Sequence, residues 1–262
     1  LILNERNKGY AMKDFVAVSL FDGISIAMSS LNRLGIYPTK YYASEVDSYA
    51  ISISKFNFPD IIRLGDVTKI TGDEIKEPVD LLIGGSPCQG FSFAGNMLQF
   101  NDSRSKLFFE YLRLLKILKP KFFLLENVKM PNKSSQVISE MLGVDYVELN
   151  SNLLSAQNRR RLYWSNLKIE KPKPQGLLLK DIIQDGEVNY NYSNTSLPNP
   201  KKNFLKIPDK FYLSKKMKNY ILADKFGNKG EINLNPKVAK PLTASYFKMQ
   251  RSNVANYISA GY

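Results

Sequence analysis

A single cysteine, Cys88, is the strongest candidate for nucleophilic chemistry in this chain. It lies within residues 84–90 (GGSPCQG), a glycine-rich loop predicted between a buried strand and a helix, where backbone groups can stabilise a thiolate. Glu126 follows the next predicted strand, so its carboxylic acid can face the same cleft and act as a general acid on a ring nitrogen. A lone cysteine is more often a small buried hydrophobic residue, so the hypothesis depends on this surrounding pattern.

The composition excludes several other kinds of chemistry. The 262 residues include one cysteine and no histidine, which rules out an internal disulfide, a Cys-x-x-Cys zinc site, a Ser-His-Asp triad and a histidine-ligated metal. We therefore expect no metal centre, and catalysis must use carboxylates, basic side chains, hydroxyls or the one thiol. No apolar run approaches the roughly 20 residues of a membrane span, and no secretory signal is recognisable, which predicts a cytoplasmic protein without membrane contact.

Three acidic residues follow successive predicted strands and suggest a nucleoside pocket. Asp22 belongs to a tight Asp-Gly turn that lets the backbone approach a ligand. Glu45 comes about 20 residues later, where a carboxylate can hold ribose hydroxyls, and Asp66 could accept from an adenine amino group. Because no Gly-x-Gly-x-x-Gly motif is present, a nucleoside without pyrophosphate fits better than a dinucleotide.

Basic residues are concentrated toward the C-terminal end. Residues 1–165 carry 20 basic and 17 acidic groups (net +3), whereas residues 166–262 carry 17 basic and 7 acidic groups (net +10). This charge favours a polyanionic partner, since phosphate contacts release counterions, although a solvated lysine-rich surface explains it equally well. The run at 157–164 (QNRRRLYW) predicts a strand on which Arg159 and Arg161 point to the same side, toward a base or phosphate.

A parallel α/β sheet would bring these residues together. In the first 150 residues, short apolar runs alternate with helical patterns, which is typical of such a sheet. The predicted strands cover residues 15–21, 40–45, 61–64, 79–83, 121–125 and 144–149, and the predicted helices end at about residue 34, begin at 47 and cover 104–118. After residue 166 prolines, asparagines and lysines become frequent and the alternation ends, which indicates a smaller irregular domain.

Six short motifs, taken in order, resemble the cytosine-5 DNA methyltransferase family. They are FDG (21–23), SEV (44–46), GDVT (65–68), SPCQG (86–90), ENV (126–128) and QNRRRLYW (157–164). The match runs from about residue 15 to 164, with a weaker similarity at 239–249 (AKPLTASYFKM). Within the family, the segments 19–36, 41–47 and 104–115 look most like the vertebrate de novo methyltransferases and similar phage or bacterial enzymes.

The resemblance implies an S-adenosylmethionine-dependent methyltransferase with a Rossmann-like sheet. Cys88 would attack carbon 6 of a cytosine flipped out of duplex DNA, and Glu126 would hold ring nitrogen 3 and the exocyclic amine. Arg161, supported by Arg159, would hold the base oxygen and the catalytic loop. The residues that would bind S-adenosylmethionine are Phe21, Asp22, Gly23, Glu45, Val46, Asp66, Val67, Pro87 and Leu107. The residues that would contact DNA are Gln89, Ser92, Arg104, Gln157 and Arg160.

The resemblance also predicts the domain organisation and the partners. Residues 12–166 would form the catalytic domain, and residues 167–238 a target recognition domain that contacts double-stranded DNA. Residues 239–262 would begin a return to the catalytic domain that is incomplete, because family members usually continue with a final helix. We therefore expect a fragment, a truncated gene or a second polypeptide that supplies this segment. The implied biological role is DNA methylation in restriction-modification, in phage self-protection or by an orphan methylase.

Two other functions are compatible with the motifs. A catalytically inactive DNA-binding or regulatory module would explain the incomplete C-terminal region, whereas Cys88, Glu126 and Arg161 argue for an active site. A tRNA methyltransferase of the same family would carry a Cys-Phe-Thr motif, which is absent because Cys88 is the only cysteine. An adenine-N6 methyltransferase would need an Asn/Asp-Pro-Pro-Tyr/Phe motif, and the chain has none.

Overall fold

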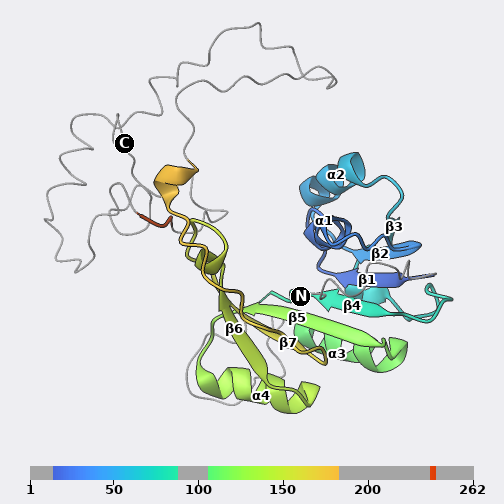
Figure 1. Cartoon of the computed structure of the whole chain (residues 1–262). Coiled ribbons are helices and arrows are strands. Elements are labelled where there is room, and N and C mark those ends of the chain that lie inside the picture. Colours follow the sequence, from blue (N-terminus) through green and yellow to red (C-terminus); the bar gives the residue numbers. More distant parts are fainter. Residues whose placement is uncertain (1–13, 88–105, 183–236, 240–262) are drawn as a thin grey trace, which may run out of the picture. The chain divides into compact units, whose positions relative to one another are not determined.

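Two compact units make up the chain, and the computed structural model describes residues 14–87, 106–182 and 237–239 (Figure 1). The first unit contains Leu1–Leu149 and Arg160–Lys171, and the second contains Asn150–Arg159 and Pro172–Tyr262. The first unit carries the sheet and its covering helices. The division into a catalytic and a target recognition domain stays a prediction, because most of residues 167–238 lie outside the described part of the chain.

A seven-stranded sheet with the order β3-β2-β1-β4-β5-β7-β6 forms the centre of the first unit. Its strands are β1 (Val16–Leu20), β2 (Lys40–Ser44), β3 (Ile62–Arg63), β4 (Leu81–Gly84), β5 (Phe122–Val128), β6 (Tyr146–Asn150) and β7 (Arg160–Ser165). The pairs β1–β2, β1–β4, β2–β3 and β4–β5 are parallel, which confirms the predicted α/β class. The chain moves outward from β1 through β2 to β3 and resumes with β4 on the other side of β1, so the strand order reverses between β1 and β4.

The pair β5–β7 is antiparallel, so the sheet is mixed and not purely parallel as the sequence predicts. Its register runs from Leu124 opposite Ser165 to Val128 opposite Arg161. Residues 151–159 connect β6 with β7, and this connection is shorter than the dozen or so residues that a parallel crossover needs. β7 is thus too close in the sequence to β6 to run parallel to it, and it pairs with β5 in the opposite direction.

The described α-helices are α1 (Ile26–Arg33), α2 (Ser48–Asn57), α3 (Lys106–Leu118) and α4 (Asn132–Leu142), and the short 3-10 turns are η2 (Val67–Lys69), η3 (Ser151–Leu153) and η4 (Leu179–Asp181). The first three helices confirm the sequence prediction. Asp47 caps α2, because its carboxylate accepts from the Ala50 N–H at 2.8 Å. The sequence did not predict α4, whose buried face includes the small polar residues Ser135 and Ser139 that interrupt the apolar periodicity.

The hydrophobic core lies on both faces of the sheet. Every residue of β1 is buried, and successive side chains of a strand point to opposite faces. On one face Val18 belongs to a cluster that includes Tyr111 of α3, and on the other Ala17 belongs to a cluster that includes Leu31 of α1. The sheet is therefore covered on both sides, as expected for a doubly wound fold.

β5 is longer than the sequence predicts. The predicted strand ends at residue 125, whereas β5 continues to Val128 because its last residues pair with β7. The expectation that Glu126 follows the strand is therefore wrong. Glu126 projects, half-buried, from within β5, and the next residue, Asn127, is buried on the opposite face. A strand holds a side chain more rigidly than a loop does.

Candidate functional site

The carboxyl ends of β1, β2 and β3 border a cleft of about 210 Å³. The residues that line it are Asp22, Gly23, Ala43, Glu45, Ile51, Ser54, Lys55, Arg63 and Gly65. Three of the predicted cofactor residues, Asp22, Gly23 and Glu45, thus lie around one opening. The cleft adjoins the end of β1, where the strand order reverses, and doubly wound sheets bind ligands at such a point.

Backbone groups hold the carboxylate of Glu45 in place. Its Oε2 accepts from the Gly23 N–H at 2.8 Å, and its Oε1 accepts from the N–H groups of Val46 and Asp47 at 2.8 and 2.9 Å. An ionised carboxylate has about four lone-pair sites, so these three donors leave one site on Oε2 for an outside donor. Glu45 can therefore accept from one further hydroxyl without moving.

The turn after β1 adopts a strained backbone conformation. Phe21, Gly23 and Ser25 have φ values of +58°, +59° and +64°, in the left-handed region that residues other than glycine rarely adopt. Such strain persists only where surrounding contacts enforce it, and it is frequent at ligand sites. Here the Asp22 carboxylate accepts from the hydroxyls of Tyr41, at 2.7 Å, and Ser25. Burial, and then the charge of Asp22, raise the pKa of the Tyr41 phenol, so it stays protonated and donates.

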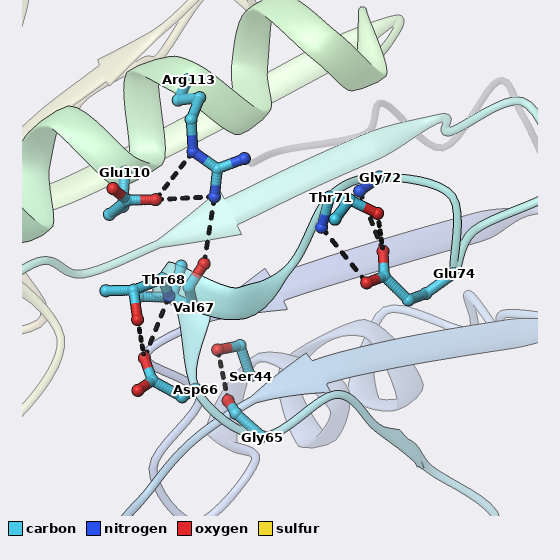
Figure 2. Close-up of polar contacts among 10 residues, drawn as sticks. All are labelled: Ser44, Gly65, Asp66, Val67, Thr68, Thr71, Gly72, Glu74, Glu110 and Arg113. Carbon is cyan, nitrogen blue, oxygen red and sulfur yellow. Dashed lines mark hydrogen bonds and ion pairs between the residues drawn. The ribbon is translucent and has the colours of Figure 1, made fainter.

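Asp66 forms a second carboxylate position at the end of β3 (Figure 2). Its Oδ1 accepts from both the backbone N–H and the hydroxyl of Thr68, each at 2.9 Å, and these bonds, the backbone one first, hold the pKa of Asp66 below its ordinary value. No described residue donates to Oδ2, which can accept from an amino group. Arg113 of α3 fixes the adjoining turn, because its Nη2 donates to the Val67 carbonyl at 3.1 Å while its Nε donates to Glu110 at 2.8 Å.

Glycines at the end of β4 allow close packing around the loop that leads to Cys88. A Cβ on Gly84 would lie 2.6 Å from the ring of Tyr111, and a Cβ on Gly85 would lie 3.2 Å from Oε2 of Glu126. A side chain at either position would force its neighbour to move. The two glycines therefore leave room for the Tyr111 ring and the Glu126 carboxylate. Cys88 itself lies outside the described residues.

Asn127 ties β5 to the same loop. Its amide nitrogen donates to the carbonyl and the hydroxyl of Ser86, at 3.2 and 3.4 Å, and both residues are buried. Its side-chain oxygen accepts from the Val128 N–H at 2.8 Å. These bonds satisfy the amide, and a buried amide with its partners in place rigidifies its surroundings. Sequence analysis missed this role, which becomes visible only when β5 extends past Glu126.

Glu126 forms an ion pair with Arg161 of β7. Their Oε1 and Nε atoms are 2.6 Å apart, and the two side chains are 33% and 17% exposed. Within the described part of the chain the Nε–H has no acceptor in hydrogen-bond geometry, so the contact with Glu126 is ionic and not a directed hydrogen bond. Arg161 also donates through Nη1 to the Arg160 carbonyl at 2.8 Å. The prediction that Arg159 and Arg161 lie on the same strand is wrong, because β7 begins at Arg160.

The remaining predicted residues take varied positions. Val46 and Pro87 are exposed, Leu107 is half-buried on α3, and the side chain of Val67 is buried in the core. In the second unit Gln157 forms an isolated bridge with Ala239. Arg160 is exposed, with its Nε 3.8 Å from Glu148. Three other predicted DNA contacts lie outside the described residues, namely Gln89, Ser92 and Arg104.

Two negative observations apply to the described part of the chain. None of its helices has the length and apolar character needed to cross a bilayer. None of its acidic residues gathers with two others in a group that could hold a metal ion.

Comparison with known proteins places this chain in a family. Residues 15–262 match the model of the C-5 cytosine-specific DNA methylases. An orphan methyltransferase, M.SPRI of Bacillus phage SPR, is 37% identical over 187 residues, which is 65% of this chain and 42% of the relative. The type II methyltransferase M.NlaIV of Neisseria lactamica is 34% identical over 215 residues, which is 73% of this chain and 48% of the relative.

A solved structure supports the same fold. The crystal structure of an E. coli protein described as a prophage-encoded DNA modification methyltransferase is 28% identical, with a TM-score of 0.51, and covers 61% of this chain and 51% of that chain. These phage and bacterial relatives agree with the resemblance found in the sequence, whereas the likeness to vertebrate enzymes stays a prediction. The chain spans about half the length of the curated relatives that it matches.

Proposed function

The chain belongs to the C-5 cytosine-specific DNA methylase family, and on that premise we propose that it transfers a methyl group from S-adenosylmethionine to carbon 5 of cytosine in double-stranded DNA. The proposed nucleophile is Cys88, and the target base is flipped out of the helix, because its reactive carbons are unreachable inside the base stack. The relatives include orphan and type II methyltransferases, and we place this activity in DNA modification of the same kind.

The observation that carries the proposal is the position of Glu126. Its Oε2 lies against Gly85, three residues before Cys88 in the sequence, while Arg161 neutralises its Oε1. A carboxyl group at the base of the loop that carries the only thiol is placed to hold the ring of a base that this thiol attacks. Asn127 fixes Ser86 from the neighbouring position on β5, which supports the loop from its other side.

Glu45 in the cleft and Asp66, which directly follows the cleft residue Gly65, fit S-adenosylmethionine. Glu45 keeps one acceptor site for a ribose hydroxyl, and Asp66 keeps Oδ2 for the adenine amino group. When bound, this cofactor supplies an electrophilic methyl group. The cofactor site that we propose comprises Phe21, Asp22, Gly23, Glu45, Val46, Asp66, Pro87 and Leu107, together with the backbone of Val67. Val67 is limited to its backbone because its side chain is buried in the core.

The proposed reaction uses the chain's own groups in sequence. The Cys88 thiolate adds to carbon 6 of cytosine, and the electron pair of the carbon 5–carbon 6 double bond moves into the ring toward nitrogen 3, where Glu126 stabilises it. This addition makes carbon 5 nucleophilic, so that it would take up the methyl group that bound S-adenosylmethionine would supply, with S-adenosylhomocysteine as the leaving group. Loss of the proton on carbon 5 and departure of the Cys88 thiolate restore the double bond and free the enzyme. Arg161 keeps Glu126 oriented throughout and would contact the base oxygen.

The DNA-binding surface is part of the same proposal. Residues 166–262 carry a net charge of +10, which suits contacts with phosphates. We assign residues 167–238 to target recognition, and Gln89, Ser92, Arg104, Gln157, Arg159 and Arg160 to contacts around the flipped base.

The test is to trap the covalent intermediate. The protein is incubated with S-adenosylmethionine and duplex DNA of mixed sequence that contains 5-fluorocytosine. Because fluorine does not leave as a proton does, an active enzyme stays bonded to the DNA through Cys88 and gives a denaturation-resistant band. The band is expected to disappear in Cys88→Ser and to require the cofactor.

Two controls make the result decisive. Ser52→Ala, whose hydroxyl bonds to the exposed Ser48 carbonyl, should still give the band. A folded wild-type protein that binds S-adenosylmethionine and DNA but gives no band would overturn the proposed activity in favour of an inactive DNA-binding module.

A further inference from the structure

A continuous row of polar side chains joins β3 and α2 to the turn after β1. Nη2 of Arg63 donates to the Ser54 hydroxyl at 3.1 Å, and the hydroxyls of Ser54 and Ser25 are 2.6 Å apart. Ser25 then donates to Asp22. Both serines are buried, at 3% and 0% exposure, so their hydroxyls depend on these protein partners. We call this row, from Arg63 to Asp22, the serine relay.

The two charged ends fix the direction of every proton in the serine relay. A guanidinium only donates and a carboxylate only accepts. Ser25 gives its single proton to Asp22, so it must accept from Ser54. Ser54 gives its proton to Ser25, so its own oxygen accepts from Arg63. Hydrogen bonds that point the same way polarise one another, and each link therefore strengthens the next.

The far end of the serine relay is firmly anchored. Arg63 also donates to the carbonyls of Phe58, at 3.0 Å, and Ile61, at 2.7 Å. Phe58 caps the C-terminus of α2, where a positive charge is favourable. The guanidinium is therefore held by the backbone and presents one N–H to Ser54 in a fixed direction.

The conformation of Ser25 indicates what the serine relay does. With φ at +64°, this position suits glycine, and a serine there is strained. Its side chain makes no capping bond to α1. It bonds instead to Asp22 and Ser54, so the hydroxyl compensates for the strain and holds the turn in its left-handed form.

We propose that Ser54 and Arg63 are positioning residues for the cofactor, which act by holding the turn at Phe21–Ser25 so that the Gly23 N–H orients Glu45. Gly23 directly follows Asp22, and its N–H lies 2.8 Å from Oε2 of Glu45, the oxygen that keeps a free acceptor site. Ser54 and Arg63 also line the cleft that Glu45 lines. This inference rests on the proposed function for the identity of the ligand, S-adenosylmethionine.

The test compares three variants of the full chain by calorimetric titration with S-adenosylmethionine, without DNA. Ser54→Ala removes the middle link, and its Kd should rise about 3- to 10-fold, the effect of losing one hydrogen bond. Ser52→Ala is the matched control on the same helix, because its hydroxyl bonds only to the exposed Ser48 carbonyl, and its Kd should not change. In steady-state assays Ser54→Ala should raise the KM for the cofactor and leave kcat close to the wild-type value.

The variant Ser25→Gly distinguishes an effect on the position of the turn from an effect on the stability of the protein. Glycine relieves the left-handed strain, so the thermal midpoint should stay equal or rise, while the loss of the hydroxyl still weakens cofactor binding by about 3- to 10-fold. If Ser25→Gly and Ser54→Ala both bind as tightly as the wild type, the positioning role is overturned. Should Ser54→Ala fail to fold, Ser25→Gly alone decides the question.

Amide hydrogen exchange in the free protein distinguishes this inference from the proposed function. The Gly23 amide should exchange faster in Ser54→Ala than in the wild type and in Ser52→Ala, whether or not a cofactor binds. An unchanged exchange rate of the Gly23 amide overturns the positioning role of the serine relay. A wild-type protein that binds no S-adenosylmethionine overturns the proposed function instead.

Discussion

Nε of Arg161 lies 2.6 Å from Oε1 of Glu126, although the two residues are not opposite each other in the sheet. The antiparallel register places Tyr163 opposite Glu126 and Arg161 opposite Val128. The guanidinium therefore reaches diagonally along the strand pair. This leaves the other carboxylate oxygen, Oε2, beside Gly85 at the base of the loop that leads to Cys88.

Neutralising Glu126 should abolish most of the activity. Glu126→Gln keeps the shape of the side chain but removes the acid, and the single-turnover rate of methyl transfer should fall about 100-fold or more. The measurement uses radiolabelled S-adenosylmethionine with enzyme in excess over duplex DNA. Glu140→Gln is the control, because Glu140 is exposed on α4, and its rate should match the wild type. Equal rates for the two variants would remove Glu126 from the chemistry.

Shortening Asn127 should destabilise the protein more than shortening an exposed asparagine. Asn127→Ala leaves the buried Ser86 carbonyl without its donor, and the free energy of unfolding in urea should fall by about 1 to 3 kcal/mol. The control is Asn57→Ala, whose amide bonds to the exposed Ile53 carbonyl at 2.9 Å and whose loss should change stability by less than about 0.5 kcal/mol. Similar losses for both variants would contradict the anchoring role.

Sequence analysis predicted those parts of the site that depend on local patterns in the sequence. Asp22 and Glu45 follow buried strands, and the carboxyl ends of parallel strands meet at one edge, so their convergence could be predicted from spacing alone. The sequence prediction failed for Glu126, which it placed after β5, because the length of β5 depends on pairing with β7. No local pattern distinguishes Ser54 from Ser52, since burial and partners decide their roles.

Removing the hydroxyl of Tyr111 should stabilise the protein. Tyr111 is fully buried, and its oxygen has no hydrogen-bond partner among the described residues. Tyr111→Phe keeps the ring against Gly84 and removes the unsatisfied group, so the free energy of unfolding should rise by up to about 1 kcal/mol. Tyr41→Phe gives the opposite sign, a loss of about 1 kcal/mol, because that hydroxyl bonds to Asp22. Chemical denaturation of both variants checks the contrast, which fails if Tyr111→Phe is the less stable of the two.

Acid should weaken the surface ion pair between Lys40 and Glu77 in a defined pH range. Bonds from Lys40 and then Tyr42 lower the pKa of Glu77 from 4.5 to about 2. A carboxyl group whose pKa is lower in the folded than in the unfolded chain stabilises the fold at pH values above its unfolded pKa. This contribution is lost as the pH falls through the folded pKa of about 2. The gap in urea midpoint between the wild type and Glu77→Gln should therefore narrow between about pH 5 and pH 2. Lys40→Met should show part of the same effect, and a gap independent of pH would refute the assignment.

The position of β7 between β5 and β6 has a consequence for protein synthesis. During synthesis, β5 and β6, the two strands that flank β7 in the sheet, are both made before β7 itself. Until Arg160–Ser165 emerges, β5 has a bare edge of unpaired N–H and C=O groups, and such edges recruit strands from other chains. Chains that end before residue 160 should therefore aggregate, and chains extended to include Arg160–Ser165 should aggregate less.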